Sequence, residues 1–419
     1  MIMGGGKSSA AINFMNDNKD KKFIYVTPYL NEAKRIKDAC PDLHFVEPSK
    51  KNPTYGFSKK NHTAELIKDG HNVATTHASF RHYDKEMIDD IISHGYTLIM
   101  DECVDMFEKN PVSDKDIIAL QKGGYFNTND DGSLTITDDE DMRLYKYGEL
   151  WSIARSHNLI RIDDDKVYGT YYWVLQKELI EAFDDVYILT YLFSSQSTCH
   201  MIEMYGIDYE YIGVKRTEER FEFCPVEEMT TPEYVEHLAD MIHIYDGKNI
   251  PRKRDLNLVG KSKTALSMGW FDNNQHRDNV IQLKNNIYNY FNNLMEDHPC
   301  RERMWATHKK GFSKLRGAGY TKGYVVFNER ATNKYAHKRV LAYCSNVYLN
   351  TSLKIYYMKN GIDPNEDEYA LSTLIQWIWR SAIRNGEEIW IYIPSKRMRE
   401  LLQNWIKETQ AKYNENKTN

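Results

Sequence analysis

The sequence predicts an α/β fold of two lobes, each built on a parallel sheet, with a β-hairpin and helix insertion in the first lobe. Two observations lead to this prediction. Short apolar runs alternate with helical segments over the first hundred residues, and the same alternation returns in the last third of the chain. Such alternation is typical of a parallel sheet that is covered by helices.

The first lobe is expected to span residues 1–214. Its predicted strands are 23–26, 73–74, 97–100 and 186–189, and its predicted helices are 30–39 and 84–93. The alternation stops after Asn110. Turn signals at 129–132 and 163–165 then predict two hairpins with a helix between them. We interpret residues 111–182 as an insertion that is open to a protein partner.

Residues 215–300 are less regular and form a connecting region with one predicted helix at 278–296. A second α/β lobe is expected over 301–419. Its predicted strands are 324–327, 340–343 and 389–393, and a last helix begins at Ser395. Apolar residues recur at helical spacing along that last helix, so this face is expected to be core.

Composition narrows the functional classes. The chain has 41% hydrophobic and 27% charged residues, as ordinary globular proteins do. No apolar run is long enough to span a membrane, and the N-terminus lacks the regions of a secretory signal. Six scattered cysteines without a C-x-x-C pair argue against a zinc ribbon and favour reduced thiols in a cytoplasmic protein.

The sharpest motif is a run of glycines followed by Lys7 and Ser8. Consecutive glycines let backbone N–H groups turn toward a phosphate at the start of the helix that Ser9 begins. Lys7 is expected to reach the β- and γ-phosphates, and Ser8 to hold Mg²⁺. The expected nucleotide-binding residues are therefore Gly4, Gly5, Gly6, Lys7, Ser8 and Ser9.

One feature departs from the usual phosphate loop. Such a loop follows a strand, yet only Met1, Ile2 and Met3 precede these glycines. Because a missing strand would leave unpaired backbone groups in its neighbours, three outcomes are open. Residues upstream supply the strand, a partner or neighbouring segment supplies it, or the sheet closes without it. We favour the first.

An acidic pair, Asp101 and Glu102, ends the apolar strand that begins at Tyr96. Ligands bind at the carboxyl edge of a parallel sheet. Asp101 is therefore expected to hold Mg²⁺ through water, and Glu102 to orient or deprotonate the attacking water.

Gln376, Arg380 and Arg384 follow one another at intervals of four residues along a helix predicted from Asp367 to Ile383 or just beyond it. That spacing places them on one face. Arginines that are held by the packing of neighbouring tryptophans are well placed to stabilise charge on a γ-phosphate as an arginine finger.

Together, MGGGKSS, LIMDEC and QWIWRSAIR resemble motifs I, II and VI of superfamily 2 DEAD/DEAH-type helicases, above all those of bacteriophages and mobile elements. The resemblance implies two RecA-like P-loop lobes, ATP and Mg²⁺ as cofactors, and a nucleic-acid partner, with DNA favoured over RNA. Leu189-Thr190-Tyr191 is similar to motif III, which couples the lobes. Further matches imply nucleic-acid contacts in motifs Ia, Ib and V, by Thr27, Pro28, Thr76, His77, Thr332 and Asn333.

The resemblance is imperfect. Three residues separate Arg380 from Arg384, where the family has two, so either arginine could be the finger. The adenine-contacting glutamine motif of the family would lie upstream of Met1, so base recognition has no support.

A basic stretch from His308 to Lys322 could contact phosphates locally, although a solvated loop is the simpler interpretation. Its candidate contacts are Lys309, Lys310, Lys314 and Arg316. Residues 127–138 mimic the spacing of a calcium loop, but their flanks predict strands, so we expect an Asp-Gly hairpin without a metal.

Three functions remain open at this point. The first is a helicase or translocase, which we favour. The second is a DNA-packaging motor, although the C-terminal third shows no nuclease-like set of acidic residues. The third is a nucleotide-binding interaction protein whose motor has decayed.

Overall fold

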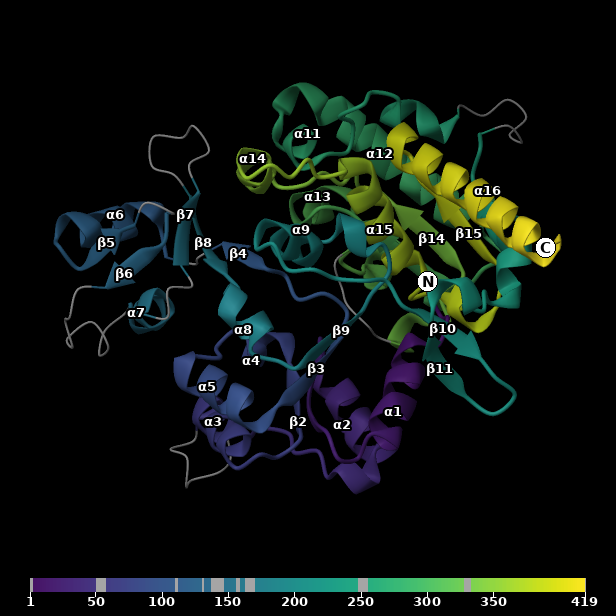
Figure 1. Ribbon diagram of the computed structural model, residues 1–419. Helices are drawn as coiled ribbons and strands as arrows, with labels where there is room; N and C mark the ends of the chain where they lie inside the picture. The colour runs from purple at the N-terminus through teal and green to yellow at the C-terminus, as the bar shows by residue number, and fades with distance from the viewer. Residues whose placement is uncertain are drawn as a thin grey trace. The chain divides into compact units, whose positions relative to one another are not determined.

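The computed structural model describes residues 3–49, 58–109, 112–129, 132–136, 147–155, 159–162, 170–247, 255–327 and 333–418. The chain forms two compact units (Figure 1). We call Gly6–Thr230 with Asn350–Pro364 the N-terminal unit. The C-terminal unit comprises Met1–Gly5, Thr231–Leu349 and Asn365–Asn419.

A four-stranded parallel sheet in the order β2-β1-β3-β9 is the centre of the N-terminal unit. The strands are β1 (Lys22–Thr27), β2 (Val73–Thr76), β3 (Tyr96–Asp101) and β9 (Asp185–Leu189). The helices of this unit outside the insertion are α1 (Lys7–Asp17), α2 (Leu30–Ala39), α3 (Lys59–Lys68), α4 (His77–Phe80), α5 (Lys85–His94), α8 (Lys177–Glu181), α9 (Ser197–Met204) and α14 (Thr351–Lys359).

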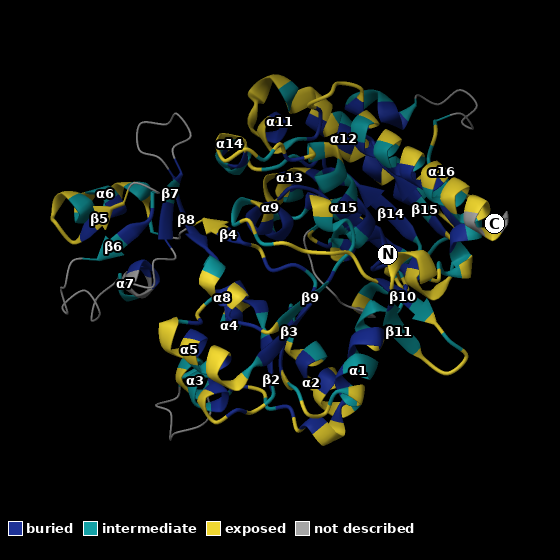
Figure 2. Ribbon diagram, in the orientation of Figure 1, coloured by how far each residue is buried: buried dark blue, intermediate teal, exposed yellow. Residues whose placement is uncertain are grey.

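The core of this sheet follows from the apolar runs of its strands. Phe23 and Tyr25 of β1 pack on one face with Ile99 of β3, against α1 and α2. The alternate residues Ile24 and Leu98 are also fully buried. Both faces of the sheet are therefore covered at its centre, as parallel sheets require. Figure 2 shows β3 as buried, whereas the edge strand β9 is only partly buried before Leu189.

The insertion in the N-terminal unit is confirmed between β3 and β9. An antiparallel sheet β4-β8-β7 carries a hairpin β5-β6 and two helices, α6 and α7. Asp130 and Asp131 of the predicted turn lie outside the described residues, but its flanks are described between β5 and β6, where the Asn129 side chain donates to Ser133 Oγ at 2.7 Å. The elements are β4 (Phe107–Lys109), α6 (Asp114–Lys122), β5 (Phe126–Thr128), β6 (Leu134–Ile136), α7 (Gly148–Arg155), β7 (Leu159–Ile162) and β8 (Thr170–Val174).

The C-terminal unit has a second parallel sheet, in the order β12-β15-β14-β13. Its strands are β12 (Ile242–Ile244), β13 (Arg303–Ala306), β14 (Val340–Tyr343) and β15 (Ile389–Tyr392). Trp305, Ala342 and Tyr392 from three of these strands share one apolar cluster with α12. The helices are α10 (Leu238–Met241), α11 (Met268–Asp272), α12 (Arg277–Asn289), α13 (Lys309–Leu315), α15 (Glu366–Ile378) and α16 (Lys396–Thr418).

The predicted α/β class with two parallel sheets is confirmed, but one predicted strand is wrong. Residues 324–327 make a single bridge, Tyr324 to Trp305, instead of a strand. The strand of this region is β13, which begins with the buried Arg303. Its guanidinium donates to the Asn292 side chain at 2.8 Å and to the carbonyls of Gly319 and His298. A charge satisfied in this way can be buried, which a hydrophobicity pattern does not reveal.

A short antiparallel hairpin follows α9 in the N-terminal unit. It consists of β10 (Gly213–Arg216) and β11 (Phe221–Cys224), and β11 packs along α1. The sequence analysis did not predict this hairpin. No helix within the described ranges has both the length and the apolarity to cross a bilayer.

Candidate functional site

The carboxyl ends of the parallel strands in the N-terminal unit carry several of the residues that the sequence singled out. β1 ends at Thr27, β2 at Thr76 and β3 at Asp101, and β9 ends at Leu189, opposite Asp101. Because the strands are parallel, these ends share one edge of the sheet, where ligands bind in open α/β folds.

Helix α1 begins beside this edge. Gly6 is its N-cap, with a left-handed φ of 84° that glycine adopts without steric cost. No side chain caps the helix, and no acidic residue stands in its first turn. The N-terminus therefore keeps the positive end of the helix dipole available for an anion.

One hydrogen bond joins the glycine motif to the acidic pair. Ser8 Oγ donates to Asp101 Oδ1 at 3.2 Å. The two residues lie far apart in the sequence, so the fold brings together the two groups that were predicted to hold Mg²⁺. Asp101 is only 8% exposed, so its carboxylate is largely removed from water.

Burial in this cluster disfavours the charged forms of both Asp101 and Lys7. Burial, with the charge of Glu102 and of Glu32, raises the pKa of the Asp101 carboxyl to about 6. Desolvation lowers the pKa of the Lys7 ammonium to about 8, although Asp101 and Glu102 attract that charge. Each charged form is therefore incompletely stabilised by the protein alone.

These residues fit a magnesium–triphosphate. A γ-phosphate would neutralise Lys7, and Mg²⁺ would neutralise Asp101 while binding the Ser8 hydroxyl. The described residues include no group of three or more His, Cys, Asp or Glu side chains placed to hold a metal. A Mg²⁺ ion here would thus take its remaining ligands from phosphate and water, as it commonly does.

Glu102 has an unusual backbone conformation. Its φ is 59°, in the left-handed region that side chains with a Cβ rarely adopt. Its N–H donates to Leu189 O at 3.1 Å, which fixes the turn at the end of β9. Strain of this kind is concentrated at functional sites, and the Glu102 side chain is partly buried.

Two residues expected to face nucleic acid are instead buried. Thr27 is fully buried, and His77 is 5% exposed. The His77 ring is hydrogen-bonded to the Asp101 carbonyl through Nε2 at 3.1 Å. His77 therefore supports the acidic pair in this structure. Pro28 and Thr76 are partly buried at the same edge of the sheet.

The predicted helix over 367–383 is too long. α15 ends at Ile378, and a separate 3₁₀ turn spans Ala382–Asn385. Ser381 ends the helix because its hydroxyl donates to the Ile378 carbonyl at 2.6 Å, in competition with a continued helix. Gln376, Arg380 and Arg384 therefore do not share one helical face.

The three residues have different surroundings in the C-terminal unit. Arg380 is 5% exposed and donates to the Phe327 carbonyl at 3.4 Å. Gln376 is partly buried and donates to Ser372 Oγ at 3.4 Å. Arg384 is exposed. Thr332 lies outside the described residues, and so does the side chain of Asn333.

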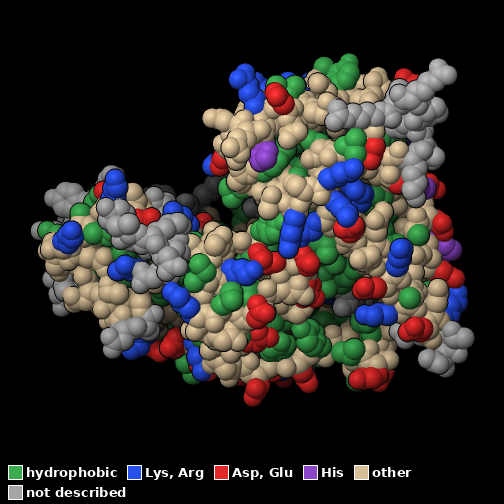
Figure 3. Space-filling model, turned by 90° about the horizontal axis from the view of Figure 1, so that it is seen from above, with side chains coloured by type: hydrophobic (Ala, Val, Ile, Leu, Met, Phe, Trp, Pro, Cys, Tyr) green, Lys and Arg blue, Asp and Glu red, His purple; other side chains and the backbone are tan. Residues whose placement is uncertain are grey.

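The basic stretch forms α13 and the turns after it, and its four candidate residues are exposed. Lys310 pairs with Asp272 at 2.6 Å, and Lys314 donates to the Phe271 carbonyl. Lys309 and Arg316 are the remaining candidates. Figure 3 shows Lys and Arg side chains interspersed with Asp and Glu over the face in view, instead of one broad basic field.

Comparisons with known proteins find a relative of this chain that is derived from a prophage. The family described as the YonV C-terminal Rossmann-like domain matches residues 236–406. Over 416 residues the chain is 36% identical to the "SPbeta prophage-derived uncharacterized protein YonV" of Bacillus subtilis (strain 168), with 97% of each chain covered. A solved structure described as XPD_APO is 11% identical and has a TM-score of 0.43, covering 95% of this chain and 93% of its own.

The left-handed conformation of Glu102 predicts that glycine at this position stabilises the protein relative to alanine, the reverse of the usual order. Glycine in ordinary structure is destabilising by about 0.5–1 kcal/mol relative to alanine. At φ 59° a Cβ costs roughly 1–2 kcal/mol, so Glu102→Gly should be the more stable of the pair Glu102→Gly and Glu102→Ala. Urea unfolding of both variants measures the difference. The exposed Glu86 of α5 is the control, because there the alanine variant should be more stable than the glycine variant. A less stable glycine variant at position 102 would contradict the left-handed assignment.

Proposed function

The chain belongs to the family of the SPbeta prophage protein YonV. For this chain we propose an ATP-driven motor that acts on nucleic acid. The observation that carries the proposal is the junction of Ser8 with Asp101, beside Lys7 and Glu102. This junction combines a phosphate-binding helix start, a cation for the γ-phosphate, two groups for Mg²⁺ and a candidate base in one unit.

The residues of this junction take separate roles in the proposed reaction. Backbone N–H groups from Gly4 to Ser8 hold the phosphates, and Lys7 neutralises the γ-phosphate. Ser8 and Asp101 would hold Mg²⁺, which would supply charge neutralisation to the phosphates. Glu102 orients and deprotonates the attacking water.

Arg380 or Arg384 completes the reaction as the arginine finger, with Gln376 as a further polar contact to the γ-phosphate. Each is a residue of the C-terminal unit.

Nucleic acid is the proposed partner, and DNA is favoured because the relative comes from a prophage. Pro28 and Thr76 contribute from the N-terminal unit. Thr332 and Asn333 contribute from the C-terminal unit, together with exposed residues of the basic stretch.

Two substitutions separate binding from turnover. Lys7→Ala should abolish ATP hydrolysis, because the charge that meets the γ-phosphate is lost. Glu102→Gln should keep ATP binding while stopping turnover, because water activation alone is lost. Steady-state ATPase rates and equilibrium binding of a fluorescent ATP analogue measure both effects. The exposed pair Lys85→Ala and Glu86→Gln on α5 is the matched control. Normal turnover by Glu102→Gln would remove Glu102 as the base.

The arginine finger is identified by comparing two arginines. Loss of the finger should lower kcat by about 10³ with little change in ATP affinity. Arg384→Ala should leave stability unchanged, because the residue is exposed. Arg380→Ala should also lower the melting temperature, because the residue is buried and hydrogen-bonded. Arg380→Lys separates the two effects, since it keeps a cation but loses the planar fork. Wild-type kcat in all three variants would exclude both arginines.

The four basic residues of this stretch are expected to contribute unequally to the salt dependence of nucleic-acid binding. Each phosphate contact that is lost should flatten the plot of log Kobs against log salt by about one unit. We expect this change for Lys309→Ala and Arg316→Ala. A smaller change is expected for Lys310→Ala, whose charge is paired with Asp272, and for Lys314→Ala, which is bonded to Phe271. Binding to single- and double-stranded DNA and RNA at several salt concentrations tests this. If the slope of log Kobs against log salt is unchanged in the variant with all four substitutions, the stretch is a solvated loop that does not contact nucleic acid.

Stimulation of the ATPase separates the competing functions. A helicase or translocase should hydrolyse ATP faster with one class of nucleic acid than with the others. An ATPase that no nucleic acid stimulates would favour a nucleotide-binding interaction protein.

A further inference from the structure

Helix α1 is anchored by a segment that lies far downstream of it. Within the described ranges, α1 is the first regular element, and β9 ends the sheet on one side. A phosphate loop ordinarily takes its position from the strand before it. In this unit the element that lies along α1 is the hairpin β10-β11.

Phe221, the first residue of β11, lies directly against the N-cap of α1. A Cβ built on Gly6 would lie 2.2 Å from Cδ1 of the Phe221 ring and 2.5 Å from Cε1. The ring therefore fills the space that a side chain at position 6 would need, and it lies against the left-handed backbone of Gly6, whose φ is 84°. Arg216, opposite Phe221 in the hairpin register, places its guanidinium 5.9 Å from the ring centroid.

The hairpin holds α1 at three further points. Asn13 Nδ2 donates to the Phe221 carbonyl at 2.9 Å. Arg220 pairs with Asp17 at 2.9 Å, near the end of the helix. Phe223 packs on Phe14, with ring centroids 5.7 Å apart. These contacts run from the first turn of α1 to its last, so the hairpin fixes the helix along its length.

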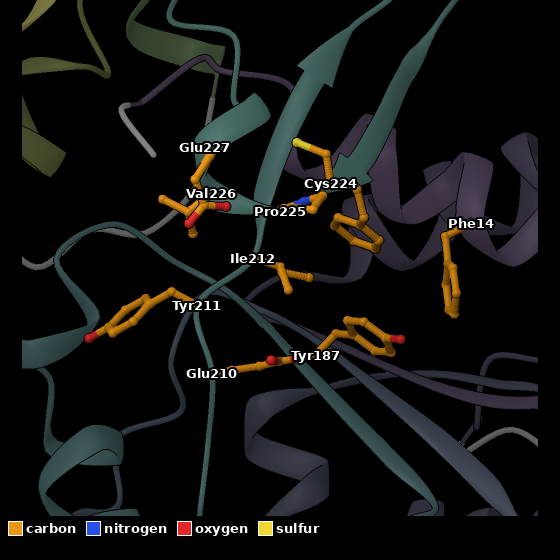
Figure 4. A pocket seen from close by; sticks show the side chains of 10 residues that line it. Phe14, Tyr187, Glu210, Tyr211, Ile212, Cys224, Pro225, Val226 and Glu227 are labelled. Atoms are coloured by element: carbon orange, nitrogen blue, oxygen red, sulfur yellow. The ribbon is translucent and has the colours of Figure 1, made fainter.

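The hairpin is not a fifth strand of the sheet. Its two strands pair with each other and make no ladder with β9. Phe223 stacks on Tyr187 of β9 at 5.4 Å, with the rings 6° from parallel. Beside this stack lies a cavity of about 510 Å³, bordered by Phe14, Ile212, Pro225 and the carboxylates Glu210 and Glu227 (Figure 4). Side chains, and not backbone hydrogen bonds, therefore join the hairpin to the sheet.

We infer that the hairpin β10-β11 positions the phosphate loop through the start of α1, and that Phe221 is the positioning residue that fixes Gly6. The ring touches the loop backbone, and it acts on a phosphate only through the conformation of that backbone. A loop held in one conformation before binding loses less entropy when it takes up the phosphates. The effect on ATP rests on the proposed function, whereas the effect on the loop does not.

The first experiment measures the loop without nucleotide. Amide hydrogen exchange is followed by mass spectrometry in a peptide covering residues 3–15, for the full-length wild type, Phe221→Ala, Phe221→Leu and Phe223→Ala. Phe223→Ala is the matched control, since Phe223 contacts Phe14 and Tyr187. Phe221→Ala should accelerate exchange at the start of α1 more than Phe223→Ala does, and Phe221→Leu should restore part of the protection. Equal acceleration by the two alanine variants would overturn the inference.

The second experiment measures nucleotide affinity in the same variants. ATP affinity should fall by roughly tenfold in Phe221→Ala, as expected for about 1.4 kcal/mol of lost preorganisation, and by less in Phe223→Ala at a similar melting temperature. If Phe221→Ala does not fold, Phe221→Leu should still bind ATP more weakly than Phe223→Leu. Equal affinities in each such pair would overturn the inference.

The two experiments fail in different ways. A wild-type protein that binds no ATP would end the proposed function, while faster exchange in Phe221→Ala would still support the role of the hairpin. If the wild type binds ATP but amide exchange at the start of α1 does not change in Phe221→Ala, only this inference fails and the proposed function stands.

Discussion

The hydrogen bond between Ser8 and Asp101 is the contact on which the candidate site of the N-terminal unit depends. It connects the start of α1 to the end of β3 at 3.2 Å. Around it the strand ends converge, His77 holds the Asp101 carbonyl, and β9 fixes the backbone of Glu102. A parallel sheet is the scaffold that makes this possible, because it delivers the ends of several separate strands to one edge.

This junction costs the protein stability in the absence of a ligand. Burial raises the pKa of the Asp101 carboxyl to about 6 and lowers the pKa of the Lys7 ammonium to about 8, so the charged form of each group is less favourable here than in water. The left-handed conformation of Glu102 adds backbone strain. A ligand that carries both negative phosphates and a divalent cation would relieve both electrostatic penalties at once. The same features that weaken the free protein therefore favour binding.

The α/β class, both parallel sheets and the insertion followed from patterns that are local in sequence. Alternating apolar runs predicted β1, β3, β9, β14 and β15, and turn residues predicted the hairpin β5-β6. Local patterns failed where distant side chains decide the structure. β13 was missed because the bonds that let Arg303 be buried come from Asn292 and Gly319, and α15 was drawn too long because a hydroxyl at Ser381 competes for the helix.

The candidate site was predictable in its residue types but not in its supports. Glycines before a lysine, and paired acids after a strand, are chemical patterns that a sequence displays directly. The contact of Phe221 with Gly6 joins two segments that share no local signal, and the burial of His77 depends on the fold around β3. Residues that position others are recognised from neighbours in space, and one sequence does not contain that information.

The segment Asn350–Pro364 leads to a different kind of conclusion. It leaves the C-terminal unit after β14, contributes α14 to the N-terminal unit and returns before α15. In the N-terminal unit, Tyr357 of α14 meets Phe107 of β4 and His200 of α9. A gene cut at the junction of Thr230 and Thr231 would therefore give two fragments, neither of which encodes a whole unit. The two compact units are therefore interleaved along the chain, and neither can be produced whole from one uninterrupted stretch of sequence.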